Sequence, residues 1–155
     1  MSQIQIGEPV QDFTASSTKG DIRLSELAGS KVVLFFYPKD STPGCTTEAR
    51  GFRDAHDEFL AADTTVIGIS RDSMRSHENF TEKQSLPYAL ISDVDEQLCL
   101  QFGVIKMKNM YGKQVRGIER STFLLDEKGV LVREWRGLRV PGHVEQVLEA
   151  VRQPS

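Results

Sequence analysis

The sequence contains very little cysteine. Only Cys45 and Cys99 occur among the 155 residues, 54 positions apart. Such a pair cannot form a disulfide framework, and it supplies no C-x-x-C motif for metal binding or dithiol redox chemistry. We therefore expect a cytoplasmic protein whose thiols are reduced.

Long apolar segments and a strong excess of charge are also missing. The longest apolar run, from Val32 to Tyr37, is far too short to span a bilayer. The first ten residues, MSQIQIGEPV, lack the charged and apolar regions of a secretory signal. The formal net charge of −3 gives no broad basic field for nucleic acid or an anionic membrane. The expected partners therefore include neither nucleic acid nor membrane.

Histidine and lysine give no alternative site. None of the histidines has a second potential metal ligand three or four residues away, so each is expected to be structural: His56, His77 and His143. Three lysines, at positions 106, 108 and 113, flank Tyr111. So short a lysine set in an acidic chain is typical of a solvated loop rather than of a nucleic-acid patch.

The apolar pattern alternates between strands and helices. Residues 31–37, 64–70 and 88–92 are rich in β-branched and aromatic side chains, as expected of strands in a sheet covered on both faces. Helical spacing predicts helices over residues 43–60, from Asp72 or Ser73 to 84, over 94–102, and at the C-terminus. A hairpin is expected around residues 126–129. No helix or strand is predicted for residues 105–118.

This order predicts an α/β fold. Strands that alternate with helices and then end in a hairpin form a mixed sheet with helices on both faces. No composition shift marks a linker, so residues 1–155 are expected to form a single domain. Ligand sites in such sheets gather at the ends of the strands, and Cys45 lies just beyond the end of the first long strand.

Cys45 occupies an unusual place for a structural cysteine. Thr42 is a suitable helix cap and Pro43 a suitable first helical residue, which places Cys45 in the first turn. Free N–H groups and the helix dipole stabilise an anion there, and the thiolate is the nucleophilic form of cysteine. Gly44 would let a small substrate approach the backbone. On position alone, a passive cysteine in a capped turn is an equally good reading.

Several motifs resemble those of the peroxiredoxins. Pro38, Thr42 and Cys45 match the P-x-x-x-[TS]-x-x-C signature of that family. The segment FYPKDSTPGCTTEA is similar to the bacterioferritin comigratory protein, or peroxiredoxin Q, group. The similarity covers nearly the whole chain through GEPVQDFTA, VIGIS, LISDVDEQLCLQFGV and RSTFLLDEKG.

The resemblance implies a thioredoxin-like fold, with a central mixed sheet flanked by helices and an N-terminal extension. It also implies thiol-dependent reduction of hydrogen peroxide and organic hydroperoxides without metal, haem, flavin or other cofactor. Cys45 would be the peroxidatic nucleophile and would pass through a sulfenic acid. Thr42 would exchange hydrogen bonds with the thiolate and the peroxide, Pro38 would shield the site, and Arg120 would match the family's active-site arginine.

Neighbouring side chains leave alternatives open. Glu48 is either a helix-start acid favoured by the dipole or a residue that orients Arg120. Tyr37 and Lys39 are expected to be a packed strand end and a solvated charge, although both could line the pocket.

The resolving step departs from the family pattern. Many relatives of this type carry a second cysteine five positions after the first, where this chain has Arg50. Cys99 could resolve Cys45 only if their Cα atoms came within about 7 Å. We expect instead a monomer with a one-cysteine cycle, reduced by an external thiol from thioredoxin, glutaredoxin or glutathione.

Two other functions fit the sequence less well. A thioredoxin-like disulfide reductase needs a cysteine three positions from Cys45, where Glu48 and Thr42 stand. A redox sensor or holdase would be oxidised stoichiometrically, whereas a peroxidase turns over with added thiol. The resemblance favours the peroxidase.

Overall fold

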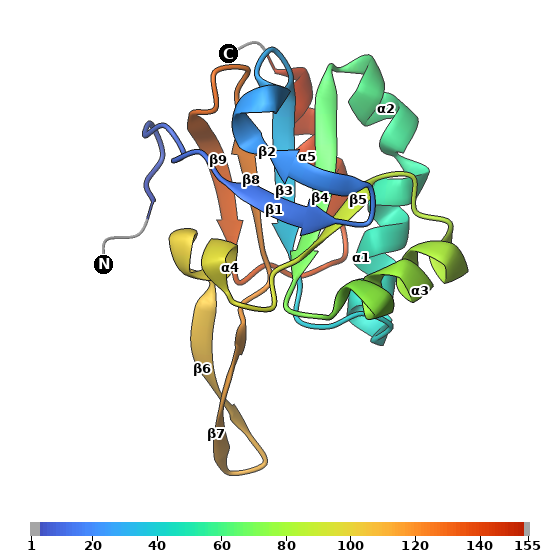
Figure 1. Cartoon of the computed structure of the whole chain (residues 1–155), viewed down its shortest axis with the longest axis vertical. Helices are drawn as coiled ribbons and strands as arrows, with labels where there is room; N and C mark the ends of the chain where they lie inside the picture. The colour runs from blue at the N-terminus through green and yellow to red at the C-terminus, as the bar shows by residue number, and fades with distance from the viewer. Residues whose placement is uncertain (1–3, 154–155) are drawn as a thin grey trace.

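The computed structural model describes residues 4–153, which form a sheet flanked by helices and a projecting hairpin (Figure 1). Among these residues no helix is both long and apolar enough to cross a membrane. The elements, in chain order, are β1 Thr14–Ser17, β2 Gly20–Arg23, the 3₁₀ helix η1 Leu24–Leu27, β3 Lys31–Phe36, α1 Pro43–Asp54, α2 His56–Ala61, β4 Thr64–Ser70, α3 Met74–Gln84, β5 Ala89–Ser92, α4 Gln97–Gln101, β6 Ile105–Met110, β7 Lys113–Ile118, β8 Ser121–Leu125, β9 Leu131–Arg136 and α5 His143–Arg152.

The main sheet is mixed and has the strand order β2-β1-β5-β4-β3-β8-β9. Strands β3, β4 and β5 run parallel, and β8 pairs antiparallel with β3. Strand β3 is buried along nearly its whole length, which explains why its sequence is apolar without alternation. The predicted mixed sheet with helices on both faces is confirmed, and β3 leads directly to α1.

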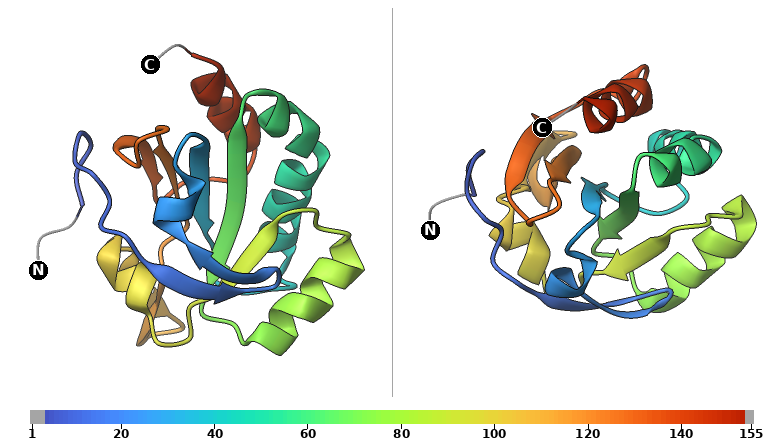
Figure 2. Two further views of the ribbon diagram at one scale, coloured as in Figure 1. Left: turned by 45° about the horizontal axis from the view of Figure 1, so that its top comes forward. Right: turned by 90° about the horizontal axis from the view of Figure 1, so that it is seen from above.

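Two apolar cores lie on opposite faces of this sheet. One packs α1, α2, α3 and α5 against alternate residues of β3 and includes Cys45. The other lies beneath the N-terminal segment and α4 and includes Cys99. Figure 2 shows α1, α2 and α5 together on one side of the sheet, with the N-terminal segment and α4 on the other. The two thiols are therefore separated by the sheet.

Most of the predicted elements are present. Strand β4 matches the predicted span, α3 begins after Ser73 and ends at Gln84, and β8 and β9 form the predicted hairpin. The side chain of Ser73 accepts a hydrogen bond from the N–H of Ser76, as expected of a cap. Strand β5 is one residue shorter than predicted at its start.

Two helices differ from their predicted extents. The single helix expected over residues 43–60 is divided at Ala55, whose ψ of 4° departs from helical geometry. The helix expected over 94–102 is only α4, because Glu96 has a φ of 63° just before it. The carboxylate of Asp93 accepts from the N–H groups of Leu98 and Cys99 and so fixes this short helix at its start.

Two hairpins were not predicted. Strands β1 and β2 pair near the N-terminus and extend the main sheet. Strands β6 and β7 form a separate two-stranded sheet that projects from the body (Figure 1). Its turn is made by Tyr111 and Gly112, with φ angles of 53° and 79°. Positive φ at both central residues is the geometry of a tight hairpin turn.

Candidate active site

Cys45 lies in the first turn of α1, immediately beyond the carboxyl end of β3. Thr42 occupies the N-cap position and Pro43 begins the helix. The N–H of Thr46 donates to the carbonyl of Thr42 at 2.8 Å. The N–H groups of Gly44 and Cys45 precede this bond, so they have no acceptor within the helix and can stabilise negative charge.

The hydroxyl of Thr42 does not cap α1 as the sequence predicted. It makes no side-chain cap bond and instead donates to the carbonyl of Lys39 at 2.9 Å. Its hydrogen is therefore used within the loop that leads from β3 to α1. The lone pairs of the oxygen stay available, so Thr42 can accept a hydrogen bond from a ligand.

Arg120 contacts both Cys45 and Glu48. Its Nη2 donates to the Sγ of Cys45 at 3.3 Å, and its Nη1 donates to Glu48 Oε1 at 2.7 Å. The antiparallel register pairs Ser121 with Phe36, which places the residue before β8 beside the end of β3. This contact supports the alternative in which Glu48 orients Arg120.

Gly44 makes room for the guanidinium. A Cβ atom at this position would lie 3.3 Å from Nη2 of Arg120, closer than most real contacts of such an atom. The absent side chain therefore permits the arginine to reach the sulfur, as well as leaving the backbone open.

Burial controls the electrostatics of the site. Glu48 is fully buried, and this burial raises its pKa to about 7 against the opposing attraction of Arg120. Burial alone would lower the pKa of Arg120, but Glu48 and Cys45 outweigh it and raise that pKa. Burial, aided by the charge of Arg120, lowers the pKa of His143 to about 4. The neutral His143 ring shares a 2.8 Å hydrogen bond with Thr122.

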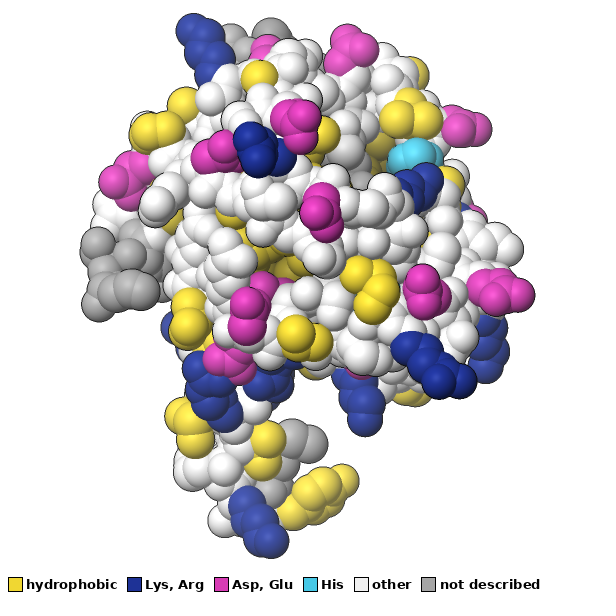
Figure 3. Space-filling model, in the orientation of Figure 1, with side chains coloured by type: hydrophobic (Ala, Val, Ile, Leu, Met, Phe, Trp, Pro, Cys, Tyr) yellow, Lys and Arg dark blue, Asp and Glu magenta, His cyan; other side chains and the backbone are white. Residues whose placement is uncertain are grey.

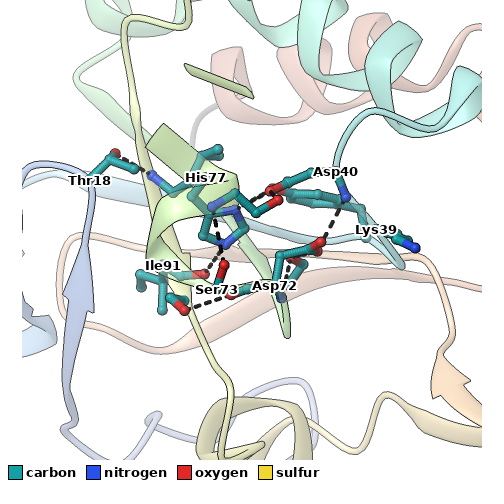
Figure 4. A network of polar contacts seen from close by, with 12 residues as sticks. Thr18, Lys39, Asp40, Asp72, Ser73, His77 and Ile91 are labelled. Atoms are coloured by element: carbon teal, nitrogen blue, oxygen red, sulfur yellow. Dashed lines mark hydrogen bonds and ion pairs between the residues drawn. The ribbon is translucent and has the colours of Figure 1, made fainter. Parts of the chain in front are cut away.

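A buried polar network fixes the loop that carries Thr42 (Figure 4). Asp40, only 5% exposed, accepts hydrogen bonds from Tyr37 at 2.6 Å and Ser76 at 2.8 Å. Its Oδ2 also lies 2.7 Å from His77 Nδ1. The loop is thereby joined to the start of α3, although Ser41 within it adopts a left-handed φ of 64°.

The two nitrogens of His77 both face acceptors. Nε2 lies 2.9 Å from the carbonyl of Ile91, and Nδ1 faces Asp40. The ring is therefore held at both nitrogens and connects the loop after β3 with α3 and β5. Asp72 adds a second connection by accepting from the N–H of Asp40 at 3.2 Å. Sequence spacing gave no signal for this network, because its members come from three separate elements.

The remaining predicted positions fall at or beside the site. Tyr37 is buried and Lys39 exposed, which confirms the packed strand end and the solvated charge. Pro38 lines a shallow, open depression of about 390 Å³ with Lys39, Arg71, Asp72, Val94 and Glu96. Within residues 4–153, no cluster of three or more His, Cys, Asp or Glu side chains could hold a metal ion.

We expect Asp40→Asn to destabilise the protein by about 2 kcal/mol, because an amide cannot replace both carboxylate oxygens that bond Tyr37, Ser76 and His77 and so leaves a buried polar group without a partner. The same change should slow the reaction of Cys45 with hydrogen peroxide, because the loop loses its anchor. Denaturant unfolding and stopped-flow oxidation measure the two effects. Asp54→Asn, on the exposed face of α1, is the matched control. Equal effects of the two substitutions would show that the network does not position the loop.

Glu48→Gln should change the pH dependence of stability. A folded-state pKa of about 7, above the ordinary value of 4.5, means that the folded protein binds an extra proton between these values. The contribution of Glu48 to the free energy of unfolding therefore falls as pH rises through that window. Wild type should lose up to about 3 kcal/mol relative to the variant between pH 4.5 and 8.

The comparison with the variant is needed because His143 acts in the opposite direction. Its lowered pKa makes its own contribution rise with pH between about 4 and 6.5. Urea unfolding of both proteins at several pH values separates the two effects. Parallel curves for wild type and Glu48→Gln would refute the assignment to Glu48.

The geometry agrees with the similarity of the chain to known proteins. Residues 6–134 match the model of the AhpC/TSA family. Peroxiredoxin Bcp of Bacillus subtilis is 44% identical over 98% of this chain and 98% of its own length. A solved structure of Xanthomonas campestris Peroxiredoxin Q is 51% identical, covers 90% of this chain and 89% of that chain, and superposes with a TM-score of 0.86.

A second solved structure bears on chemistry. It concerns the alkyl peroxide reduction activity of Xanthomonas campestris bacterioferritin comigratory protein, at 50% identity, 90% coverage of both chains and a TM-score of 0.86. Position 50 in the present chain is arginine, so the resolving cysteine usual at that place is absent. The chain belongs to the AhpC/TSA family, as a thiol-dependent peroxiredoxin of the Bcp, or Q, type.

Proposed function

We propose that Cys45 reduces hydrogen peroxide and organic hydroperoxides and is then regenerated by an external thiol. The observation that carries this proposal is the contact of Arg120 with both the sulfur of Cys45 and the carboxylate of Glu48. The alkyl peroxide reduction named for the Xanthomonas relative supports the substrate class.

The chemistry follows from the groups around the sulfur. The Cys45 thiolate attacks the terminal oxygen of the hydroperoxide, so that an S–O bond forms as the O–O bond breaks. The products are a sulfenic acid and an alkoxide or hydroxide, which takes up a proton to give alcohol or water. Arg120 and the N–H groups of the first helical turn are donors for the developing charge. Thr42 accepts from the terminal hydroxyl of the peroxide, since its own hydrogen is directed at Lys39.

Stabilisation of the transition state must supply most of the rate. A free cysteine is already a few per cent thiolate at pH 7, so complete ionisation would gain only about 30-fold. Enzymes commonly accelerate reactions by ~10⁶ or more. The remaining factor requires donors that hold the leaving oxygen more strongly in the transition state than in the ground state. The planar guanidinium, fixed by Glu48, meets that requirement.

The position of Cys99 supports an external reductant. Cys45 and Cys99 pack in cores on opposite faces of the sheet. An internal disulfide would require α4 to unwind and its cysteine to cross to the other face, in addition to movement of α1. Cys45 is 1% exposed, so an external thiol requires only that the first turn of α1 opens to expose it.

Cys99 is also a poor nucleophile. It is fully buried, and burial raises the pKa of its thiol, with the nearby carboxylate of Asp93 adding to the effect. Its backbone N–H is held by Asp93 at 2.8 Å. The thiolate needed to attack a sulfenic acid is therefore disfavoured at this position.

Arg120→Lys should lower the second-order rate constant with hydrogen peroxide by about 100-fold or more. Lysine keeps the positive charge but presents no planar fork that contacts Cys45 and Glu48 together. Stopped-flow oxidation measures the rate constant. Thiolate absorbance at about 240 nm follows the ionisation of Cys45 in the same samples.

Arg133→Lys is the matched control, because Arg133 lies exposed on β9 over Trp135. Its rate should stay within about twofold of wild type. A loss in Arg120→Lys that merely follows the thiolate fraction would show that the guanidinium does not stabilise the transition state.

Intact mass after one equivalent of peroxide tests the one-cysteine cycle. Wild type and Cys99→Ser should both gain one oxygen atom, trapped by dimedone, and both should turn over with added dithiothreitol. Because Cys99 lies on the other face of the sheet, its replacement should leave turnover unchanged.

A different result would contradict the one-cysteine cycle. A wild-type mass lower by two hydrogen atoms, together with loss of turnover in Cys99→Ser, would establish an internal disulfide. Cys45→Ser, which lacks the nucleophile, is the baseline for both measurements.

A further inference from the structure

The β6–β7 hairpin differs in charge from the rest of the molecule. Residues 105–118 contain four cationic side chains and no acidic one, and so contribute +4 to a chain whose net charge is −3. The remaining residues therefore sum to −7. Figure 3 shows Lys and Arg side chains along this projection and acidic side chains distributed over the body.

The hairpin also exposes large apolar side chains. Met107 is 61% exposed, Tyr111 at the tip 99%, and Val115 41%. They are three of the seven large hydrophobic residues exposed in the described part of the chain, although the hairpin is only a small fraction of it. Tyrosine, methionine and arginine are the residue types enriched where proteins bind one another.

The base of the hairpin is held in place. Glu96 pairs with Arg71 at 2.9 Å and also with Arg116 of β7. The Nζ of Lys108 donates to the carbonyl of Ile118 at 2.5 Å, which ties the two strands together. An isolated two-stranded hairpin is only marginally stable in water, so these contacts pre-organise it.

This base adjoins the active site. Strand β7 ends at Ile118, two residues before Arg120. Burial lowers the pKa of Lys108, and the charge of Arg120 adds to this effect while Cys45 opposes it, which places Lys108 within electrostatic reach of both. The depression lined by Pro38 and Val94 also includes Arg71 and Glu96. The surface is thus continuous from the hairpin to the loop beside Cys45.

We propose that this hairpin, with the adjoining depression, docks an acidic protein thiol that reduces oxidised Cys45. The inference rests on the proposed one-cysteine cycle, which needs an external reductant. That thiol attacks the sulfenic acid of Cys45, forming a mixed disulfide and releasing water. A second thiol of the partner then displaces Cys45 as a thiolate and leaves the disulfide on the partner.

The shape of the hairpin favours a protein over a small thiol. Six residues of strand extend about 20 Å, so the exposed Tyr111 lies beyond the reach of a small molecule that is bound at Cys45. The acidic body argues against a polyanion that covers a broad face of the molecule. A second copy of this chain would present the same acidic body to the hairpin, and the experiment below separates that case.

The test reverses two hairpin charges that are exposed and outside the site, in Lys106→Glu/Lys113→Glu. The probe is a reduced thioredoxin of acidic isoelectric point, recycled by its reductase and NADPH. At low ionic strength, kcat/KM for this thioredoxin should fall about tenfold, and added salt should reduce the difference. The rate of Cys45 oxidation by peroxide and turnover with dithiothreitol, an uncharged small thiol, should be unchanged.

The matched control is Lys83→Glu/Lys128→Glu, which makes the same change in net charge. Lys83 lies in the last turn of α3, at the end away from the Asp40 loop, and Lys128 lies in the β8–β9 turn, next to the strand end that pairs with the start of β3. Both are thus far from the strand end that leads to Cys45. This variant should keep wild-type kcat/KM for thioredoxin within about twofold, since steering acts through local charge.

Several outcomes would overturn the proposal. These are an unchanged kcat/KM in the hairpin variant, an equal loss in the control, or a wild-type protein that turns over with dithiothreitol but not with the acidic thioredoxin. A dimer that the hairpin substitutions convert to monomer in sedimentation velocity would assign the hairpin to self-association. Failure of the one-cysteine cycle is read separately, from loss of dithiothreitol turnover in Cys99→Ser.

Discussion

The contact between Arg120 and Cys45 depends on the pairing of β8 with β3 and on the buried carboxylate of Glu48. The guanidinium reaches the sulfur because β8 pairs with β3 in a register that places Arg120 beside the end of β3. It keeps its orientation because Glu48, one turn further along α1, is buried with it. A buried pair of this kind is weak evidence for stability, since desolvation opposes the attraction. Its value here is orientation of a planar donor toward a single sulfur.

Periodicity in the sequence predicted much of this arrangement. The unbroken apolar run of β3 located the strand. The residues Thr42, Pro43 and Gly44, which favour a turn and a helix start, located the turn and the beginning of α1. These features are local, and each follows from the preferences of a few adjacent residues. The family signature then identified Arg120, for which spacing alone gave no reason. Two of the contacts that define the site, from Arg120 to Cys45 and to Glu48, join residues more than 70 positions apart.

The features that were missed depend on tertiary contacts or on weak local signals. The hydroxyl of Thr42 turns to Lys39 rather than capping α1, because the loop around it is already held by Asp40 and His77. The break at Ala55 lies within a continuous helical pattern, so composition could not reveal it. The β6–β7 hairpin gives only a weak strand signal, because the apolar alternation that begins at Ile105 is interrupted at Asn109 and again at Gly117.

The sheet bears directly on the proposed one-cysteine cycle. By separating Cys45 from Cys99 it places the two thiols in different apolar cores, and the carboxylate of Asp93 makes the second thiol less nucleophilic. An internal resolving step would therefore require the disruption of packing on both faces. Reduction from outside disturbs only the first turn of α1, whose N-terminal residues have few intrahelical bonds to lose. In the proposed cycle, specificity for the reductant would come from the surface around that turn, where Glu96 joins the depression beside Pro38 to Arg116 of the cationic hairpin.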